Sequence, residues 1–346
     1  MKDIKIYFLG NKLGHSIHKL IPTNLTNKRR NEENSFHSVE GLKRTHFINK
    51  ADILFFRNRG ATTSDKAFKS LSKRVNDSKL IINDIRSFLN YDSKDRSFEI
   101  WRKNNLQCPN HISFSLDEMN ESVHMEKMIN QFLEKYKKIL IRTNNETGSN
   151  GLYVTQKKKE IPNIISTLKN RVNSLKLHRK DTKIMCVEYI QSKSRNNSNN
   201  LYRVHILFDE ILSYYVTTSN REEFHNADMT IDDLGTFISD NKTFQNILPN
   251  IKEDLIKAVK LLGCNIGAIE FFLVDDKPCF LELNPIWGGH ASRNGFGDKA
   301  VMDYLKKNKQ TLLTDIPNIF KWLDYKTYYA DMYSLIKKNY LENFIL

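Results

Sequence analysis

The sequence predicts a mixed α/β and α+β protein in which a small parallel sheet precedes a region of antiparallel hairpins. Three short apolar runs in residues 1–90 alternate with polar stretches, which is typical of a small Rossmann-like α/β domain. Residues 201–219 and 268–284 each contain two apolar runs around a short turn, which indicates antiparallel pairing. Amphipathic spacing elsewhere predicts helices that cover these sheets.

The three N-terminal strands are predicted at IKIYFLG (4–10), ADILFFRNRG (51–60) and KLIINDI (79–85). The segment GNKLGHS after the first strand suggests a nucleotide loop, but it lacks the GxGxxG spacing and is weak evidence.

Later elements follow from periodicity and turn residues. Helices are expected at 94–106, 117–138, 160–175 and 250–263, and strands at 137–142, 152–156 and 184–190. Residues 221–246 are polar and are expected to be partly loop, and the first hairpin is expected to turn at Asp209-Glu210. The aromatic-rich region 299–346 is predicted to be mostly helical and to pack on the body of the protein.

Four units are predicted along the chain. They are an N-terminal α/β domain (1–92), a linker helix with a first lobe (93–187), a second lobe with a polar hairpin (188–310) and a C-terminal helical tail (311–346).

Composition narrows the class of protein. The chain has 346 residues, 40% of them hydrophobic, and a mean hydropathy of -0.54. No apolar run approaches the roughly 18 residues that a membrane span needs, and the N-terminus does not resemble a secretory signal. We therefore expect a cytoplasmic protein. The four cysteines form no CxxC pair, which favours free, buried thiols over a zinc site.

The net charge of +14 allows two interpretations. A basic surface could bind nucleic acid or an anionic membrane. The basic residues are spread over distant segments such as 27–30, 157–159 and 337–338, however, which favours compositional drift. Nucleic acid is therefore not the expected partner, although phosphorylated or carboxylated substrates would still be attracted.

The second hairpin places carboxylates on one strand face. With a turn at 275–277, Val274 pairs with Pro278 and Glu270 faces Glu282. Asn284 and the rings of Phe272 and Phe280 share that face, whereas Leu281 and Leu283 face the other way. Opposed carboxylates need neutralising, by a shared proton or, better, by a divalent cation. Three hard oxygen ligands, Glu270, Glu282 and Asn284, favour magnesium.

Here the chain resembles the ATP-grasp superfamily of carboxylate–amine ligases, a group that includes glutathione synthetase, D-alanine–D-alanine ligase and the ribosomal-protein glutamate ligases. The resemblance runs over residues 82–300 as ordered motifs. They are IIND with SKDRSFEIWRKNNLQCPNHISF, ILIRTNNETGSNGLYV, CVEYI, LYRVHI and GAIEFFLVDDKPCFLELN.

The resemblance implies a preceding α/β domain and two lobes that grip ATP. It further implies a ligase that activates a carboxylate as an acyl phosphate and joins it to an amine on an amino acid, a peptide or a glycan-linked substrate, with release of ADP. By this resemblance Glu270, Glu282 and Asn284 hold Mg²⁺ that bridges the phosphates. Lys94 contacts the phosphates and Arg203 stabilises the transferring phosphoryl group, as suits a reaction driven by positioning and charge. Homo-oligomers are frequent among these ligases.

Other residues are assigned by the same resemblance. Adenine is expected at the hinge formed by Val187, Glu188, Tyr189 and Ile190. The loop from Thr147 through Gly148 and Ser149 to Gly151 is expected to close over the phosphates, with Asn226 near them. The substrate is expected beside Gly288, Gly289, His290 and Arg293. Apart from the resemblance, His205 shares a strand face with Arg203, and a structural role is favoured for it over a substrate contact.

Departures from the family pattern concern four places. Arg142 stands where a lysine is usual, Glu270 where aspartate is commoner, and Leu201 where an acidic residue often precedes the strand arginine. Arginine keeps the charge and can bind phosphate with two donors, so Arg142 is expected to contact the phosphates and to assist catalysis, although it is not isosteric with lysine. The loop also has only two glycines. These departures leave room for an altered or lost activity. Two alternatives also stay open: phosphoryl transfer to an acceptor that is not a carboxylate, and a basic nucleic-acid-binding protein with a degenerate nucleotide fold.

Overall fold

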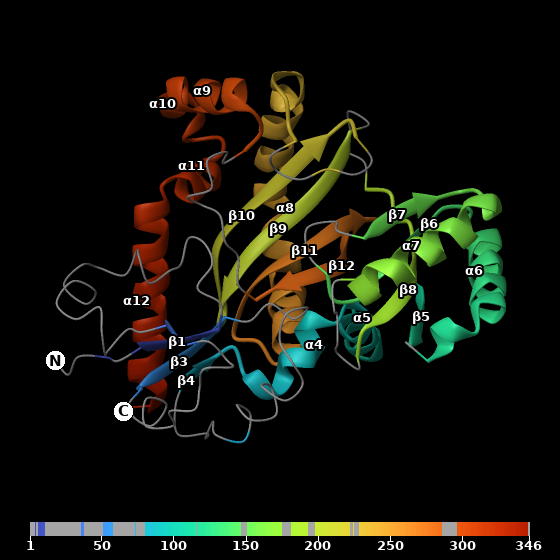
Figure 1. Cartoon of the computed structure of the whole chain (residues 1–346). Helices are drawn as coiled ribbons and strands as arrows, with labels where there is room; N and C mark the ends of the chain where they lie inside the picture. The colour runs from blue at the N-terminus through green and yellow to red at the C-terminus, as the bar shows by residue number, and fades with distance from the viewer. Residues whose placement is uncertain are drawn as a thin grey trace.

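The computed structural model describes most of the chain beyond residue 80 and short segments before it. The described residues are 4, 6–10, 36–37, 51–57, 73, 80–115, 117–146, 151–174, 181–192, 198–221, 224, 228–285 and 296–344. They contain three four-stranded sheets. Figure 1 shows the first sheet near both termini, the second in the lobe at the right and the third between them.

The N-terminal sheet is parallel, as the sequence predicts. Its strand order is β2-β1-β3-β4, with β1 at Ile6–Gly10, β2 at Phe36–His37, β3 at Ile53–Arg57 and β4 at Leu80–Ile82. The apolar runs of β3 and β4 are buried, which is expected of a parallel sheet covered on both faces.

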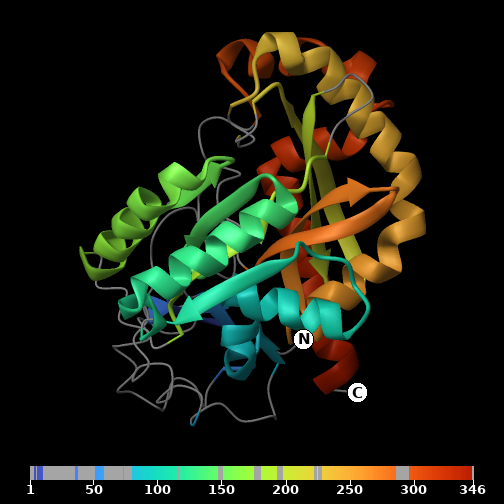
Figure 2. The same cartoon turned by 90° about the vertical axis from the view of Figure 1, so that its right-hand side faces the viewer.

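The second sheet forms what we call the lid lobe. It is antiparallel, in the order β5 (His111–Ser115), β8 (Lys183–Glu188), β6 (Ile139–Thr143) and β7 (Leu152–Thr155). Helices α6 (Ser122–Tyr136) and α7 (Ile161–Ser174) cover one face (Figure 2). Alternation decides which side chains they meet. Ile139 and Ile141 pack against the helices, whereas Leu140 and Arg142 point to the opposite face.

The third sheet, here called the body sheet, has the order β10-β9-β11-β12 and is also antiparallel. Its strands are β9 (Asn199–Leu207), β10 (Glu210–Ser219), β11 (Ile266–Val274) and β12 (Lys277–Asn284). One face packs on α8 (Leu234–Leu261) through residues such as Phe244 and Phe271, whose ring centroids are 6.1 Å apart. The other face turns toward the lid lobe.

Both predicted hairpins form, but their turns differ from the prediction. The first turns at Phe208-Asp209, one residue earlier than expected. The second has a two-residue turn at Asp275-Asp276, so Val274 pairs with Lys277 rather than with Pro278. Both aspartates have positive φ, 52° and 59°, as a tight hairpin turn with this right-handed twist requires.

Helix α8 extends far beyond the predicted segment. It begins after a capping box formed by Thr230 and Asp233, and it continues through Pro249. Residues 221–246 were expected to be partly loop, and residues 228–230 are not helical, whereas 234–246 belong to the helix. Its polar surface hides buried positions at helical spacing, among them Phe237 and Phe244.

The helix that links the first two sheets ends beside the hairpin of the third. After η3 (Ile85–Ser87) and α4 (Phe88–Asp92), helix α5 (Lys94–Lys103) packs its Trp101 ring 5.4 Å from that of Phe280. The Trp101 indole donates to the Ala258 carbonyl of α8 at 2.9 Å. These contacts fix α5, and therefore Lys94 at its first turn, against the body sheet.

The C-terminal region is helical and packs on the body, as predicted. It comprises α9 (Lys299–Lys307), α10 (Lys309–Leu312), α11 (Pro317–Leu323) and α12 (Tyr325–Phe344). Trp322 and Tyr328 are buried against β9 and β10. Of the cysteines, Cys186, Cys264 and Cys279 are buried free thiols and Cys108 is half-buried. Within the described segments, no helix is long and apolar enough to cross a membrane.

Candidate nucleotide-binding site

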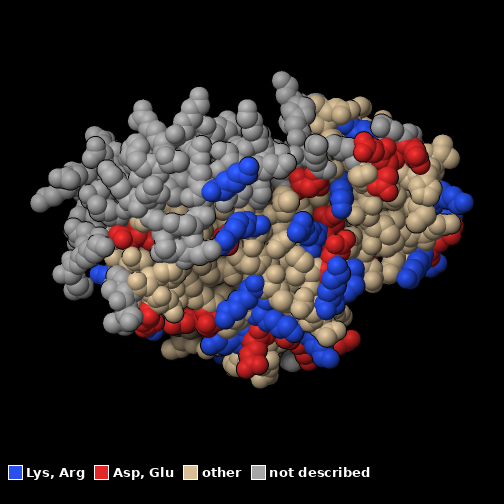
Figure 3. All heavy atoms as spheres, turned by 90° about the horizontal axis from the view of Figure 1, so that it is seen from below, with Lys and Arg blue, Asp and Glu red and all other residues tan. Residues whose placement is uncertain are grey.

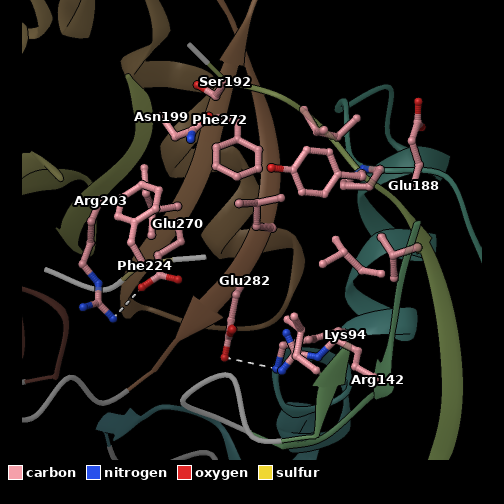
Figure 4. Close-up of a pocket in the computed structure, with 18 of the residues that line it drawn as sticks. Lys94, Arg142, Glu188, Ser192, Asn199, Arg203, Phe224, Glu270, Phe272 and Glu282 are labelled. Atoms are coloured by element: carbon pink, nitrogen blue, oxygen red, sulfur yellow. Dashed lines mark ion pairs between the residues drawn. The ribbon is translucent and has the colours of Figure 1, made fainter. Parts of the chain in front are cut away.

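A cavity of about 330 Å³ lies between the lid lobe and the body sheet. Its polar wall holds most of the charged residues singled out from the sequence (Figure 4). The remaining wall is apolar and is supplied by both lobes: Phe98, Pro109, Leu140, Leu152, Met185, Val187, Ile190, Leu201, Phe272 and Leu281. An apolar slot that ends in charged groups suits a ligand with a flat ring and an anionic tail.

The opposed carboxylates lie on the wall formed by the body sheet. Glu270 pairs with Glu282 across β11 and β12, as the sequence predicts, and Ala268 pairs with Asn284. A β-bulge between the turn and Glu270 restores the register that the shorter turn shifts. The bulge also turns Leu281 into the cavity, whereas Phe280 points into the core. The expectations for Leu281 and Phe280 were therefore wrong.

Each of the two carboxylates is paired with a cation. Lys94 Nζ lies 3.2 Å from Glu282 Oε1, and Arg203 Nη2 lies 2.8 Å from Glu270 Oε1 (Figure 4). Burial raises the pKa of Glu282, but Lys94 and Arg142 outweigh that effect and leave it below its usual value. Because Glu282 is therefore ionised near neutral pH, a proton shared between the two carboxylates is disfavoured.

Lys94 and Arg142 converge on one main-chain carbonyl. The Glu146 carbonyl accepts hydrogen bonds from Lys94 Nζ at 2.8 Å and from Arg142 Nη2 at 3.0 Å. Burial lowers the pKa of both side chains, and Glu282 opposes the shift in each case. A guanidinium has five N–H donors and an ammonium three, so both cations keep donors beyond these bonds for an anionic ligand.

Arg203 is held by two partners from neighbouring strands. Besides Glu270, the hydroxyl of Tyr215 accepts from Arg203 Nη1 at 3.0 Å. Burial would lower the pKa of Arg203, but Glu270 and Tyr215 raise it above its usual value. Arg203 Nε is buried and has no hydrogen-bond partner within the described residues. A buried donor of this kind at a cavity wall suits an anionic oxygen.

The hinge residues 187–190 line the far end of the cavity. The Glu188 carboxylate accepts from Asn110 N at 3.2 Å and from Asn110 Nδ2 at 2.8 Å, and in Figure 4 it points away from Glu270 and Glu282. Tyr189 N donates to the Lys138 carbonyl at 3.2 Å, and Lys138 Nζ lies 4.0 Å from the centre of the Tyr189 ring. These contacts fix the hinge between β5 and β6.

The donors at the hairpin fit a hard divalent cation. Glu270, Glu282 and Asn284 all line the cavity and offer carboxylate and amide oxygens, the ligands that Mg²⁺ prefers. In the described chain no three His, Cys, Asp or Glu residues form a metal-binding group. Magnesium that is also bound by nucleotide phosphates and water nevertheless needs only one or two protein carboxylates.

Several predicted site residues lie outside the described residues: Thr147, Gly148, Ser149, Asn226, Gly288, Gly289, His290 and Arg293. Gly151 is described and has a positive φ of 62°. His205 is buried, with Nδ1 2.7 Å from Ser213 Oγ and 3.0 Å from Tyr328 Oη, so its role is structural, as favoured from the sequence.

Sequence reasoning missed two groups that hold the cations of the polar wall, the hydroxyl of Tyr215 and the carbonyl of Glu146. Tyr215 pairs with Arg203 across β9 and β10, so an accurate register would have found it. The Glu146 carbonyl is a main-chain group, so no residue type in the sequence indicates its role.

Comparison with known proteins gives the fold. No family model matches the sequence, and no curated protein matches it. Many solved structures match, among them the following three, which cover nearly the whole chain. The D-alanine–D-alanine ligase from Bacillus anthracis complexed with ATP is 11% identical, with 92% of this chain and 98% of that chain covered and a TM-score of 0.53.

The other two are of similar extent. The ATP-grasp ligase PsnB complexed with precursor peptide PsnA2 and AMPPNP is 11% identical, with coverages of 90% and 99% and a TM-score of 0.51. The D-cycloserine synthetase DcsG is 10% identical, with coverages of 89% and 99% and a TM-score of 0.52. At these identities the likeness is one of backbone architecture, and that architecture is the ATP-grasp fold.

Proposed function

We propose that this protein is an ATP- and Mg²⁺-dependent ligase that joins a carboxylate to an amine and releases ADP. The observation that carries the proposal is the pairing of two opposed carboxylates, each with its own cation, on the wall of a cavity between two lobes. A polyphosphate would neutralise the two protein cations, and a divalent cation would neutralise the two carboxylates. Structures with the same fold contain ATP and AMPPNP.

The nucleotide would lie with its base at the hinge and its phosphates at the polar wall. The main chain of residues 187–190 and the apolar side chains of both lobes would contact adenine. Lys94 and Arg142 would contact the phosphates, together with Gly151, Asn226 and the loop residues that precede Gly151. Glu270, Glu282 and Asn284 would hold Mg²⁺, which supplies charge neutralisation at the phosphates.

Two displacement steps would follow. A carboxylate oxygen of the substrate attacks the γ-phosphorus, the bond to the β–γ bridging oxygen breaks, and ADP leaves. The amine then attacks the carbonyl carbon of the acyl phosphate, the bond from that carbon to the phosphate oxygen breaks, and the nitrogen loses a proton. Arg203 would stabilise negative charge on the transferring phosphoryl group. Phosphoryl transfer depends on positioning and charge rather than on a protein nucleophile. The acid or amine would lie beside Gly288, Gly289, His290 and Arg293.

The test is ADP release from MgATP against pools of carboxylic acids and amines, including amino acids and peptides, with mass spectrometry of the products. We expect ADP release that requires both an acid and an amine. We also expect a product whose mass is the sum of the masses of these two substrates less one water. Glu282→Gln should abolish turnover while the circular dichroism spectrum stays unchanged. ADP release at the wild-type rate in Glu282→Gln would remove the hairpin from the mechanism. A stable phosphorylated product that is insensitive to amines would instead favour a phosphotransferase.

A further inference from the structure

Glu146 joins two cations of the cavity, Lys94 of α5 and Arg142 of the lid lobe, to a third cation outside it. Its carbonyl accepts from Lys94 Nζ and Arg142 Nη2, at 2.8 and 3.0 Å. Its carboxylate accepts from Arg171 of α7, with Nη2 2.8 Å from Oε1 and Nε 3.0 Å from Oε2. Thr143 Oγ1 donates to the same carboxylate at 2.8 Å. One residue therefore transmits the position of Arg171 to the polar wall.

The chain leading to Glu146 is a buried polar segment rather than the surface loop that its composition suggests. Asn144 and Asn145 are buried. Asn144 Nδ2 donates to Asp95 Oδ1 at 2.9 Å, and Asn145 Nδ2 donates to Thr182 Oγ1 at 2.9 Å. Lys94 N donates to the Asn144 carbonyl at 3.0 Å. Leaving a buried polar group without its hydrogen-bond partner costs much free energy. The segment that ends at Glu146 therefore resists displacement.

Arg171 and Gly151 secure the far side of Glu146. The Glu146 side chain is 7% exposed and that of Arg171 is 31% exposed, and Arg171 is not part of the cavity wall. Gly151 lies against the pair: a Cβ there would come within 2.9 Å of Glu146 Oε2 and 3.0 Å of Arg171 Cδ. The bidentate pairing of a planar guanidinium with a carboxylate fixes direction as well as distance.

We propose that Arg171 is a positioning residue for the nucleotide phosphates. By holding the Glu146 carboxylate, it fixes the Glu146 carbonyl, and that carbonyl in turn sets where Lys94 and Arg142 present their remaining donors. Without Arg171, the carboxylate loses its charged partner, and the carbonyl that both cations share is free to move. The proposal rests on the proposed nucleotide site and adds to it a residue that touches no part of the ligand.

The test compares a ligand that has phosphates with one that has none. Arg171→Ala should raise the Kd for ATP with Mg²⁺ about tenfold, as expected for the loss of a partly buried charge pair. The Kd for adenosine should stay unchanged, because the hinge does not depend on Arg171. Calorimetry measures the first value and ligand-observed NMR titration the second. Lys169→Ala removes the same charge from the same helix and should leave both values unchanged.

Two further variants separate positioning from general damage. Arg171→Lys should recover part of the ATP affinity, because it keeps the charge and loses the bidentate geometry. Glu146→Gln should weaken ATP binding similarly to Arg171→Ala, and the double variant should be little worse than either single one, since both changes break one connection.

Equal loss of ATP and adenosine affinity in Arg171→Ala would show that the pair only holds the lobe together and would overturn the proposal. Unchanged ATP affinity in both Arg171→Ala and Glu146→Gln would overturn it as well. If Arg171→Ala does not fold, the same comparison made with Glu146→Gln and Arg171→Lys decides. A wild-type protein that binds no ATP would instead refute the proposed function, so the two failures are distinguishable.

Discussion

At the scale of single residues, the two carboxylates of the hairpin are already paired with the cations proposed to hold phosphate. Lys94 contacts Glu282, and Arg203 contacts Glu270. A phosphate that approaches without a metal would meet both carboxylates at close range. A metal that approaches without a phosphate would meet the cations. We therefore expect the metal and the nucleotide to bind with positive coupling, each lowering the electrostatic cost of the other.

The variant Glu282→Gln tests this coupling. It removes one negative charge from the phosphate end of the cavity and leaves the shape of the side chain unchanged. Metal-free ATP, measured by calorimetry in the presence of EDTA, should bind about three- to tenfold more tightly than to the wild-type protein, because Lys94 is released and repulsion falls. The strengthening of ATP binding by Mg²⁺ should shrink or vanish. Weaker metal-free binding in the variant would contradict the pairing of charges described above.

Tyr215 supplies a second prediction at this scale. Tyr215→Phe removes the hydroxyl that accepts from Arg203 Nη1 and leaves a donor without its partner. Since a hydrogen bond to a charged group contributes on the order of 1.5–3 kcal/mol, we expect kcat to fall by about tenfold or more with a smaller change in KM for ATP. Tyr214→Phe, a change of the same kind at the neighbouring residue on the opposite strand face, is the matched control. Equal effects of the two variants would argue against a role for Tyr215.

At the scale of elements, two hairpins show what counting along a sequence can predict and what it cannot. In the second hairpin the predicted turn was one residue too long, yet Glu270 faces Glu282, because a bulge shifts the register back. In the first hairpin, counting from the predicted turn would place Val216 opposite Arg203, whereas the structure places Tyr215 there. The position of a bulge depends on tertiary packing, and alternation of polar and apolar residues along a strand does not record it.

Other parts of the site also could not be predicted from the sequence. In β6, Ile139 and Ile141 face helices α6 and α7, whereas Arg142 faces the cavity. The segment from Thr143 to Glu146 has the composition of a surface turn, but its side chains are buried by partners that are distant in sequence, among them Asp95 and Thr182. Local residue preferences cannot show such partners.

The turn of the second hairpin gives a prediction of stability. Asp275 and Asp276 both have positive φ, which asparagine and glycine adopt at lower cost. Replacing Asp275-Asp276 by Asn-Gly should raise the free energy of unfolding by about 0.5–1 kcal/mol, measured by urea denaturation with an unchanged m-value. Ala-Ala at the same positions removes the same two charges and should lower stability. A gain with Ala-Ala would show that charge repulsion, rather than backbone conformation, dominates.

At the scale of the whole molecule, two sheets and one helix supply the charged residues of the cavity. The body sheet carries the hairpin and Arg203, the lid lobe carries Arg142 and the hinge, and α5 brings Lys94 between them. The cavity therefore exists only where two lobes meet, and its charged residues come from distant parts of the sequence. The aromatic side chains of α11 and α12 close the sheet behind Tyr215, since the centroid of the Trp322 ring lies 5.3 Å from that of Tyr215.

The net charge of +14 bears on whether nucleic acid is a partner of this protein. On the face shown in Figure 3, Lys and Arg alternate with Asp and Glu over the described residues and form no continuous basic track. Because the basic residues are also spread over distant segments of the sequence, we expect a 20-nucleotide single-stranded DNA to bind weakly, with an affinity that falls steeply as salt is raised from about 50 to 200 mM, as nonspecific phosphate contacts require. It should not displace a fluorescent ATP analogue from the cavity, whereas unlabelled ATP should.

Glu282→Gln serves as the control: DNA binding should be unaffected by it, while metal-dependent nucleotide binding should be lost. Tight DNA binding that competes with ATP at 200 mM salt would favour the nucleic-acid alternative over the ligase, because the cavity would then be part of the DNA-binding surface.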